Sequence, residues 1–378
     1  MKILIVAIPT IHTYRWCAQL EGEGHELFFF NILHRKIPDY FKGFTIINDW
    51  EKNKLGKWAT SKSLPRVIRY ANKNFNFSFE ENFHLILKKI NPDIVHSFNM
   101  NISYPLIPYM IKHPNIPWMC NTWGSDIYYY QNFDIAKQKV DAMLGRLDFL
   151  FTDAKRDFEL ALAKGFKGKY LGTFPGGGGY NIPEKIMAVK ERNTIIIKGY
   201  EHKFGRALNI LKAIKKCDEV TKKYKLYIFS AHQSVVDFAE TLRKEGFEIV
   251  INSTQKKIPH QEILNVMKNS IMYIGNNISD GIPNTLLEAI ISGAFPIQSN
   301  PGGATAEILI HGKNGFLIEN PEDINEITKH ITTALQNKEF LENVQQFNHD
   351  IVAPTLAYEL IKEKVVEKYK YLESKICN

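Results

Sequence analysis

The chain has 378 residues, of which 44% are apolar and 23% are charged, and its formal net charge is +8. This length favours two globular domains, and the composition excludes a disordered or fibrous protein. No apolar run approaches the roughly 18 residues that cross a bilayer. The positive charge is uneven, because residues 1–170 hold 23 Lys and Arg against 16 Asp and Glu, whereas residues 171–378 hold 25 against 24. A basic first half suggests an anionic partner.

The first apolar stretch, residues 2–8, is short and is followed by Pro9, with no small-residue cleavage site after it. It therefore predicts a buried strand rather than a signal peptide. The cysteines show neither CxxC pairing nor the spacing of a disulfide framework: Cys17, Cys120, Cys217 and Cys377. Their pattern indicates reduced thiols in a cytoplasmic protein.

Short apolar runs alternate with helical patterns along the whole chain. In the first half they predict strands at 2–8, 25–31, 93–98, 116–121 and 148–152. In the second half they predict strands at 194–199, 225–230, 246–251, 270–275, 294–298 and 315–318. Most of these runs are apolar on both faces, as in parallel strands covered by helices. The sequence therefore predicts α/β architecture with two doubly wound sheets.

A glycine-rich stretch, residues 172–179, separates the two halves and contains four consecutive glycines. Such a run sustains neither a helix nor a strand, so it marks the domain boundary. We expect a first domain at 1–172 and a second at 173–354. An amphipathic helix at about 355–378 follows, with packing back onto the first domain as one option.

The segment from Ser279 to Gly293 follows a predicted strand and combines turn and helix signals. Gly281 allows close approach of the backbone, Pro283 suits the first helical position, and Gly293 suits the position just past the helix end. The free N–H groups at the start of this helix would favour an anion such as a diphosphate.

Glu288 lies within this predicted helix among apolar neighbours. A buried carboxylate requires partners, and the two hydroxyls of a ribose would supply them. Two plainer roles remain open, namely Asp280 as a simple helix cap and Glu288 as a surface residue.

Asp280, seven intervening residues and Glu288 are followed by Phe295-Pro296-Ile297, Gly302-Gly303, Glu307 and Gly312-Lys313-Asn314-Gly315-Phe316-Leu317. This pattern resembles the Glu-x7-Glu region of retaining family-four glycosyltransferases, with Asp280 in place of the more common glutamate. The resemblance implies the GT-B fold, in which two Rossmann-like domains face each other across a cleft. It also implies that Glu288 binds the nucleotide ribose and that Asp280 lies near the donor sugar. The donor-binding stretch between them comprises Gly281, Ile282, Pro283, Asn284 and Thr285.

Further site residues follow from the same resemblance. Lys198 and Arg206 match the cations that hold the donor phosphates, with Lys203 as the alternative. His12 and Arg15 after the first strand, and His96 at the end of a later one, are expected to face the cleft, and His96 is included among the catalytic candidates. The plainer alternatives are solvated cations and structural histidines.

The stretch Asn121-Thr122-Trp123-Gly124-Ser125-Asp126 resembles the Thr-x-His-Gly-x-Asp loop of the family. Trp123 replaces the usual histidine, so no catalytic histidine is carried over. Asp126 is expected to hold the loop or a sugar hydroxyl, and an Asx-type turn is the alternative.

The resemblance implies retaining transfer of a sugar from a nucleotide diphosphate sugar, preferably UDP-linked, to a glycan or lipid-linked glycan in surface polysaccharide or lipopolysaccharide synthesis. The sequence has no Asp-x-Asp pair and no His/Cys cluster with metal-ligand spacing, so we expect neither a metal nor a cofactor beyond the donor. A GT-B-type nucleotide-sugar epimerase and a non-catalytic sugar-nucleotide-binding protein are the alternatives.

The stretch 52–73 interleaves basic residues with aromatic and aliphatic ones. This composition suits an anionic membrane surface, which would place the protein peripherally on the cytoplasmic face. A solvated helix is the alternative, and no nucleic-acid-binding motif is present.

Overall fold

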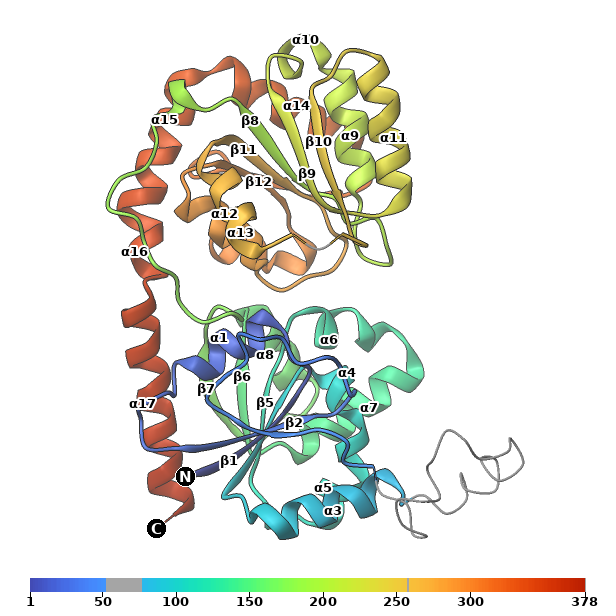
Figure 1. The fold of residues 1–378 in the computed structure, drawn as a ribbon, viewed down its shortest axis with the longest axis vertical. Coiled ribbons are helices and arrows are strands. Elements are labelled where there is room, and N and C mark those ends of the chain that lie inside the picture. The colour runs from blue at the N-terminus through green and yellow to red at the C-terminus, as the bar shows by residue number, and fades with distance from the viewer. Residues whose placement is uncertain (52–76, 257, 378) are drawn as a thin grey trace, which may run out of the picture. The chain divides into compact units, whose positions relative to one another are not determined.

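The computed structural model describes residues 1–51, 77–256 and 258–377 (Figure 1). The chain forms two compact units that are not contiguous in sequence. The first comprises Met1–Thr152, Phe158–Gly178 and Glu363–Asn378, and the second comprises Asp153–Asp157 and Gly179–Lys362. The second unit thus resumes at Gly179, beyond the boundary expected at 172/173, and it also includes a short segment from the first half.

The first unit is built on a sheet whose strands, within the described residues, run in the order β3-β2-β1-β4-β5-β6-β7 and pair in parallel. The strands are β1 Lys2–Ala7, β2 Glu26–Asn31, β3 Thr45–Ile47, β4 Ile94–Phe98, β5 Trp118–Asn121, β6 Phe149–Thr152 and β7 Lys169–Thr173. The central strands β1, β4 and β5 are almost wholly buried, as expected of parallel strands that are covered on both faces.

Helices cover both faces of this sheet. They are α1 Ile11–Ala18, α3 Phe79–Ile90, α4 Met100–Ser103, α5 Ile107–Lys112, α6 Ser125–Tyr128, α7 Asp134–Arg146, α8 Lys155–Ala163 and α17 Tyr358–Ile376, with short 3-10 turns at Tyr104–Leu106 and Tyr130–Asn132. One core includes α3, α5 and α7. On the other side, Trp16 of α1 packs edge-on against Phe151, and Tyr369 of α17 stacks on the same ring.

The second unit contains a parallel sheet whose strands, in the part of the chain described, run in the order β10-β9-β8-β11-β12-β13. The strands are β8 Thr194–Lys198, β9 Lys225–Ala231, β10 Ile249–Ser253, β11 Ser270–Gly275, β12 Phe295–Ser299 and β13 Phe316–Ile318. Three consecutive isoleucines in β8, Ile195–Ile197, have no exposed surface. Burying each contributes about 1.5–3 kcal/mol to folding.

Two apolar layers enclose this second sheet. The helices are α9 Ala207–Lys216, α10 Asp218–Thr221, α11 Gln233–Lys244, α12 His260–Lys268, α13 Asn284–Ile291, α14 Ile324–Gln336, α15 Lys338–Phe347 and α16 Ala353–Thr355, with shorter turns at Val189–Glu191, Pro301–Gly303, Thr305–Glu307 and Asn348–Val352. One layer includes α9, α11 and α14, and the other includes α12 and α13, as Figure 1 shows.

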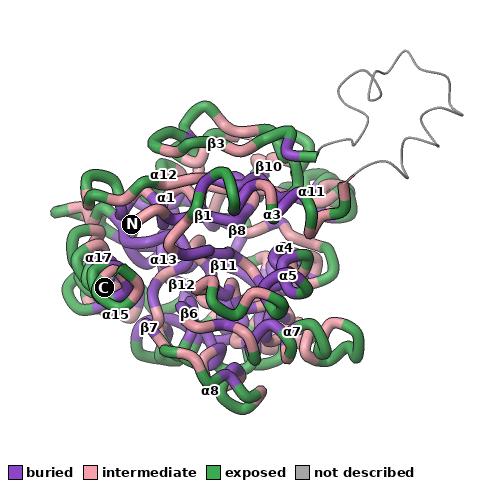
Figure 2. The backbone as a smooth tube through the Cα atoms, turned by 90° about the horizontal axis from the view of Figure 1, so that it is seen from below, coloured by how far each residue is buried: buried purple, intermediate pink, exposed green. Residues whose placement is uncertain are grey.

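The predicted fold class is confirmed, because both units are α/β with parallel sheets covered by helices. Strands β1, β8 and β11 consist almost entirely of buried residues, which Figure 2 draws in purple. Because all strands within a sheet are parallel, their carboxyl ends share one edge. This is the edge at which such sheets bind ligands.

Candidate functional site

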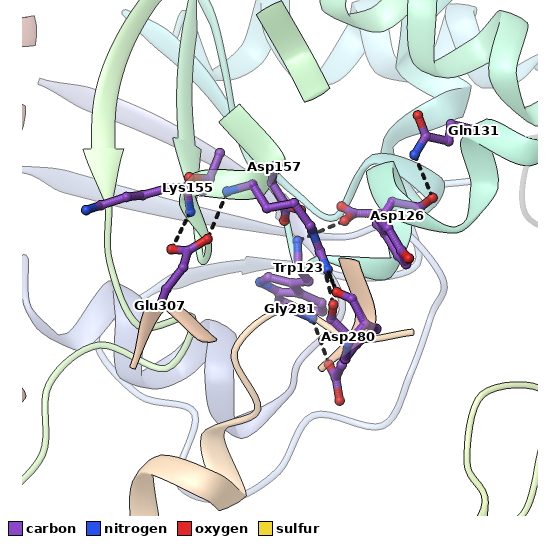
Figure 3. A network of polar contacts seen from close by, with 12 residues as sticks. Trp123, Asp126, Gln131, Lys155, Asp157, Asp280, Gly281 and Glu307 are labelled. Atoms are coloured by element: carbon purple, nitrogen blue, oxygen red, sulfur yellow. Dashed lines mark hydrogen bonds and ion pairs between the residues drawn. The ribbon is translucent and has the colours of Figure 1, made fainter. Parts of the chain in front are cut away.

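Asp280 lies in the loop after β11, at the carboxyl edge of the second sheet. Its Oδ1 accepts a hydrogen bond from the Gly281 N–H at 3.1 Å, drawn in Figure 3, and its Oδ2 accepts one from Asn277 Nδ2 at 2.9 Å. Oδ2 also lies 3.5 Å from Lys198 Nζ at the end of β8. Asp280 therefore does not cap α13, whose N-cap is Pro283.

Lys198 is the cation paired with the Asp280 carboxylate, and its side chain is 12% exposed. Burial, the strongest single influence, disfavours its charged form, but the negative charge of Asp280 and nearby tyrosines outweighs burial, so the pKa of Lys198 is raised. The ammonium group therefore remains charged at neutral pH. A partly buried cation in a low-dielectric setting interacts strongly with an anion.

The segment 153–157 contacts the loop that contains Asp280. Arg156 donates from Nη2 to the carbonyl oxygen of Asp280 at 2.9 Å and from Nη1 to that of Pro301 at 2.5 Å. Its charge is balanced by the fully buried Asp157 at 2.7 Å. Buried guanidinium groups require this complete set of partners, so Arg156 is a rigid support for the loop.

Glu307, in the short turn Thr305–Glu307, anchors the same segment. Its two carboxylate oxygens accept from the backbone N–H groups of Lys155 and Arg156 at 2.7 and 2.9 Å, as Figure 3 shows for the labelled pair. These N–H groups belong to the first turn of α8, where a negative charge is favourable.

Gly281 is required by close packing inside the protein. A Cβ at this position would lie 2.2 Å from Asp153 Oδ2 and 2.4 Å from Asp153 Oδ1. The sequence interpretation attributed this glycine to close approach of a ligand, whereas the neighbour found in the structure is the Asp153 carboxylate.

The predicted helix is α13, and it begins at Asn284, one residue later than expected, with Pro283 as N-cap and no side-chain cap. The side chains at its start contact the protein. Tyr180 Oη donates to Asn284 Oδ1 at 2.6 Å, and Thr285 Oγ1 lies 2.9 Å from Tyr273 Oη. Ile282 packs against the small core beneath the helix. The side chains at the start of α13 are thus engaged by other parts of the protein.

Glu288 is buried on α13, with 5% of its side chain exposed. Its Oε1 lies 2.9 Å from Nε2 of His260, which begins α12 and is 37% exposed. The carboxylate is therefore not a surface group. Its partner His260 is a residue that the sequence interpretation did not include.

Arg206 is placed differently from the expectation. Its Nε is hydrogen bonded to Glu322 Oε1, and Nη1 donates to the carbonyl oxygen of Gly205 at 2.8 Å. Arg206 is therefore engaged by Glu322 in this structure, and its role toward the donor phosphates stays a prediction. Lys203, the alternative cation, is exposed, with Nζ 5.7 Å from the centre of the Phe204 ring.

In the first unit, His12 and Arg15 lie on α1, the helix that follows the first strand. The rings of His12 and Trp123 meet edge-on with centroids 6.4 Å apart. Asp126 is fully buried and holds the loop, because it accepts hydrogen bonds from the N–H groups of Trp123 at 2.9 Å and Met100 at 2.8 Å. Among the described residues the Trp123 indole N–H is buried without a partner.

His96 does not reach any surface, and its catalytic assignment is withdrawn. It has no exposed area, its Nε2 lies 2.8 Å from Asn121 Oδ1, and its Nδ1 lies 3.0 Å from Tyr369 Oη. Burial lowers the pKa of His96 to about 3. The ring is thus a neutral core group that ties β4 to β5 and α17.

This burial predicts a pH-dependent stability. The unfolded chain binds a proton to this histidine below about pH 6.5, whereas the folded chain does not until about pH 3, so stability is lost as the pH falls through this window. We expect the stability advantage of the unmodified protein over His96→Gln to shrink by up to about 1.4 kcal/mol per pH unit below pH 6. Urea unfolding followed by tryptophan fluorescence measures it. The exposed His84→Gln is the control, and a difference that does not vary with pH would contradict the assignment.

The basic stretch 52–73 lies outside the described residues, so its membrane role stays a prediction. In the described part of the chain, no helix is both long and apolar enough to span a membrane. Nor do the residues described there bring three or more His, Cys, Asp or Glu together as metal ligands.

Residues 184–349 match a family model described as glycosyl transferases group 1. No curated protein sequence matches the chain significantly.

Solved structures resemble almost the entire chain. The lipopolysaccharide outer core galactosyltransferase WaaB, in its apo form, shares 14% identity with a TM-score of 0.66, covering 98% of this chain and 100% of that one. HepE from Anabaena, in complex with UDP, shares 10% identity with a TM-score of 0.68, at 98% and 100% coverage. Sucrose-phosphate synthase from Thermosynechococcus elongatus shares 14% identity with a TM-score of 0.70, at 99% and 100% coverage. The likeness at these identities concerns the fold, which is GT-B.

Proposed function

We propose that this chain moves a sugar from a UDP-sugar to a glycan or lipid-linked glycan acceptor, and the match of residues 184–349 to the model of glycosyl transferases group 1 supports this. The observation that carries the proposal is the buried Glu288 on the helix that follows the Asp280 loop. A carboxylate there is matched by the two hydroxyls of a ribose, which donate hydrogen bonds to a charged acceptor.

The diphosphate of the donor is proposed to bind beside Lys198 and the first turn of α13. In that position the ammonium group and the helix N–H groups stabilise the negative charge that develops as the sugar leaves. The bond between the anomeric carbon and the phosphate oxygen breaks, and a bond to the acceptor oxygen forms on the same face. The acceptor proton passes to the departing phosphate, and because the new bond forms on the face that the phosphate leaves, the configuration is retained.

The choice of UDP is supported by a solved structure of the same fold. HepE from Anabaena is described in complex with UDP and glucose. We propose that Asp280, held 3.5 Å from Lys198, lies close to the transferred sugar. The proposed transfer needs no metal ion, because Lys198 and the helix start supply the positive charge.

The acceptor is proposed to bind to the first unit, through His12, Arg15 and Trp123. A lipopolysaccharide galactosyltransferase is among the similar structures, which supports a role in surface polysaccharide or lipopolysaccharide synthesis. Docking of the basic stretch 52–73 on an anionic membrane would bring such an acceptor within reach.

The test is turnover of nucleotide sugars with and without acceptor, in the presence of a chelator. We expect UDP release from at least one of UDP-glucose, UDP-galactose and UDP-N-acetylglucosamine, and none from GDP-sugars. Recovery of a new UDP-sugar isomer would indicate an epimerase instead. UDP binding without release from any donor or acceptor would indicate a non-catalytic binding protein.

A further inference from the structure

A cluster of rings lies beside Lys198 and has no role in the site as described so far. It consists of Tyr200, His202 and His232, which follow the carboxyl ends of β8 and β9. The two imidazole centroids are 5.2 Å apart, and the Tyr200 centroid lies 5.1 Å from that of His202. Lys198 Nζ lies 4.9 Å from the centre of the Tyr200 ring. The cluster is therefore at the same edge of the sheet as the Lys198–Asp280 pair.

The backbone brings these side chains together in a tight arrangement. The His232 N–H donates to the Gly199 carbonyl at 3.1 Å, and a Cβ on Gly199 would lie 2.7 Å from the Ala231 Cα. Ser230 has a φ of +54°, which a residue with a side chain adopts at a cost. Strain of this kind is typical of positions that orient functional groups.

Hydrogen bonds from the backbone determine which nitrogen of each imidazole is a donor. His202 Nδ1 accepts from the N–H groups of Phe204 and Gly205 at 3.1 and 3.0 Å, and His232 Nδ1 accepts from the Glu201 N–H at 3.3 Å. A backbone N–H can only donate, so both Nδ1 atoms are unprotonated. Each neutral ring must then carry its proton on Nε2. Among the described residues neither Nε2 has a hydrogen-bond partner.

The pKa of His202 is lowered, which keeps its ring neutral. Burial, followed by the proximity of the His232 imidazole and of the Lys198 ammonium group, lowers the pKa of His202, although a backbone hydrogen bond and Asp280 oppose this. The side chain is nevertheless exposed enough to meet a ligand. It offers a fixed N–H donor near Lys198 without adding a second positive charge.

We propose that the Nε2–H groups of His202 and His232 donate hydrogen bonds to the diphosphate oxygens of the bound nucleotide. This inference rests on the proposed function and adds two binding residues to it. Arg206 is engaged by Glu322, and Lys198 supplies one positive charge to a group that carries more than one negative charge. Two oriented neutral donors supply the missing hydrogen bonds, and hydrogen bonds to charged acceptors are the stronger kind.

The test replaces each histidine by asparagine and measures the binding of UDP and of uridine by calorimetry. Asparagine Oδ1 can still accept from the backbone N–H groups, but the residue lacks a donor at the Nε2 position. We expect His202→Asn and His232→Asn each to weaken UDP binding about tenfold, with uridine binding unchanged.

His311→Asn is the matched control, because His311 Nδ1 accepts from the Leu317 N–H at 3.1 Å in the same way. His311 precedes β13 and so lies at the opposite edge of the sheet. Its substitution should leave UDP binding unchanged, and thermal unfolding of all variants verifies folding.

The possible results distinguish the histidine–diphosphate contact from the proposed function on which it rests. An unmodified protein that binds no nucleotide would refute the proposed function itself. If the unmodified protein binds UDP and both histidine variants retain its affinity, the diphosphate contact is refuted while the function stands. Equal losses for UDP and uridine would also overturn the inference, since the lost contact would then involve the nucleoside.

Discussion

UDP is expected to bind the Glu288→Gln variant at least about a hundredfold more weakly than the unmodified protein. Glu288 is 5% exposed, and Oε1 contacts His260 at 2.9 Å. Glutamine keeps the size of the side chain but replaces a charged acceptor of two hydroxyl donors by one neutral oxygen and an NH₂ group. The second oxygen site thus turns from acceptor to donor and opposes a ribose hydroxyl. Calorimetric titration with UDP measures the loss.

A nucleotide without the ribose hydroxyls provides the matching chemical test. 2′,3′-Dideoxy-UDP should bind the unmodified protein and Glu288→Gln with the same low affinity, because the partner of the carboxylate is absent. Glu245→Gln is the control variant, since Glu245 is paired with Lys215 at the far ends of α9 and α11. UDP affinity that survives in Glu288→Gln would remove the ribose assignment.

Replacement of Lys198 by alanine should reduce kcat for sugar transfer by about 10² to 10³. The ammonium group is 12% exposed and 3.5 Å from Asp280 Oδ2, and its pKa is raised despite burial, so it stays charged during turnover. Without it, the charge that develops on the leaving diphosphate loses its nearest cation. Steady-state rates of UDP release, with kcat and KM fitted separately, provide the measurement.

Two further lysine variants make this result specific. Lys223→Ala removes an exposed cation from the turn before β9 and should leave turnover unchanged. Lys203→Ala tests the alternative cation of the second sheet. A loss of kcat that is larger for Lys203→Ala than for Lys198→Ala would transfer the phosphate role to Lys203.

Strands covered on both faces could be predicted from the sequence, because complete burial leaves a continuous apolar run. Strands β8 and β11 are of this kind. The two strands that the prediction missed, β3 and β7, are the edge strands of the first sheet. Only one of the five residues of β7 is buried, and β3 is mostly exposed, so neither carries a continuous apolar signal.

The same distinction applies to the site residues. Those within one local sequence pattern could be predicted, whereas their partners from distant parts of the chain could not. Asp280 and Glu288 belong to one loop and helix, and the sequence pattern around them was sufficient to select both. Their partners could not be selected, because Arg156 and His260 come from separate parts of the chain and meet the site only through packing. His202 and His232 did carry a signal, since each closely follows the end of a strand.

The interleaving of the two units has a practical consequence for dissecting this protein. A cut between Gly178 and Gly179 would separate Asp153–Asp157 from the rest of the second unit. Glu307 would then lose the backbone N–H groups that its carboxylate caps. The same cut would remove Tyr369 from the hydrogen bond with His96 in the other half. Neither fragment would be a self-sufficient module, so chimaeras that exchange donor specificity between relatives need four junctions rather than one.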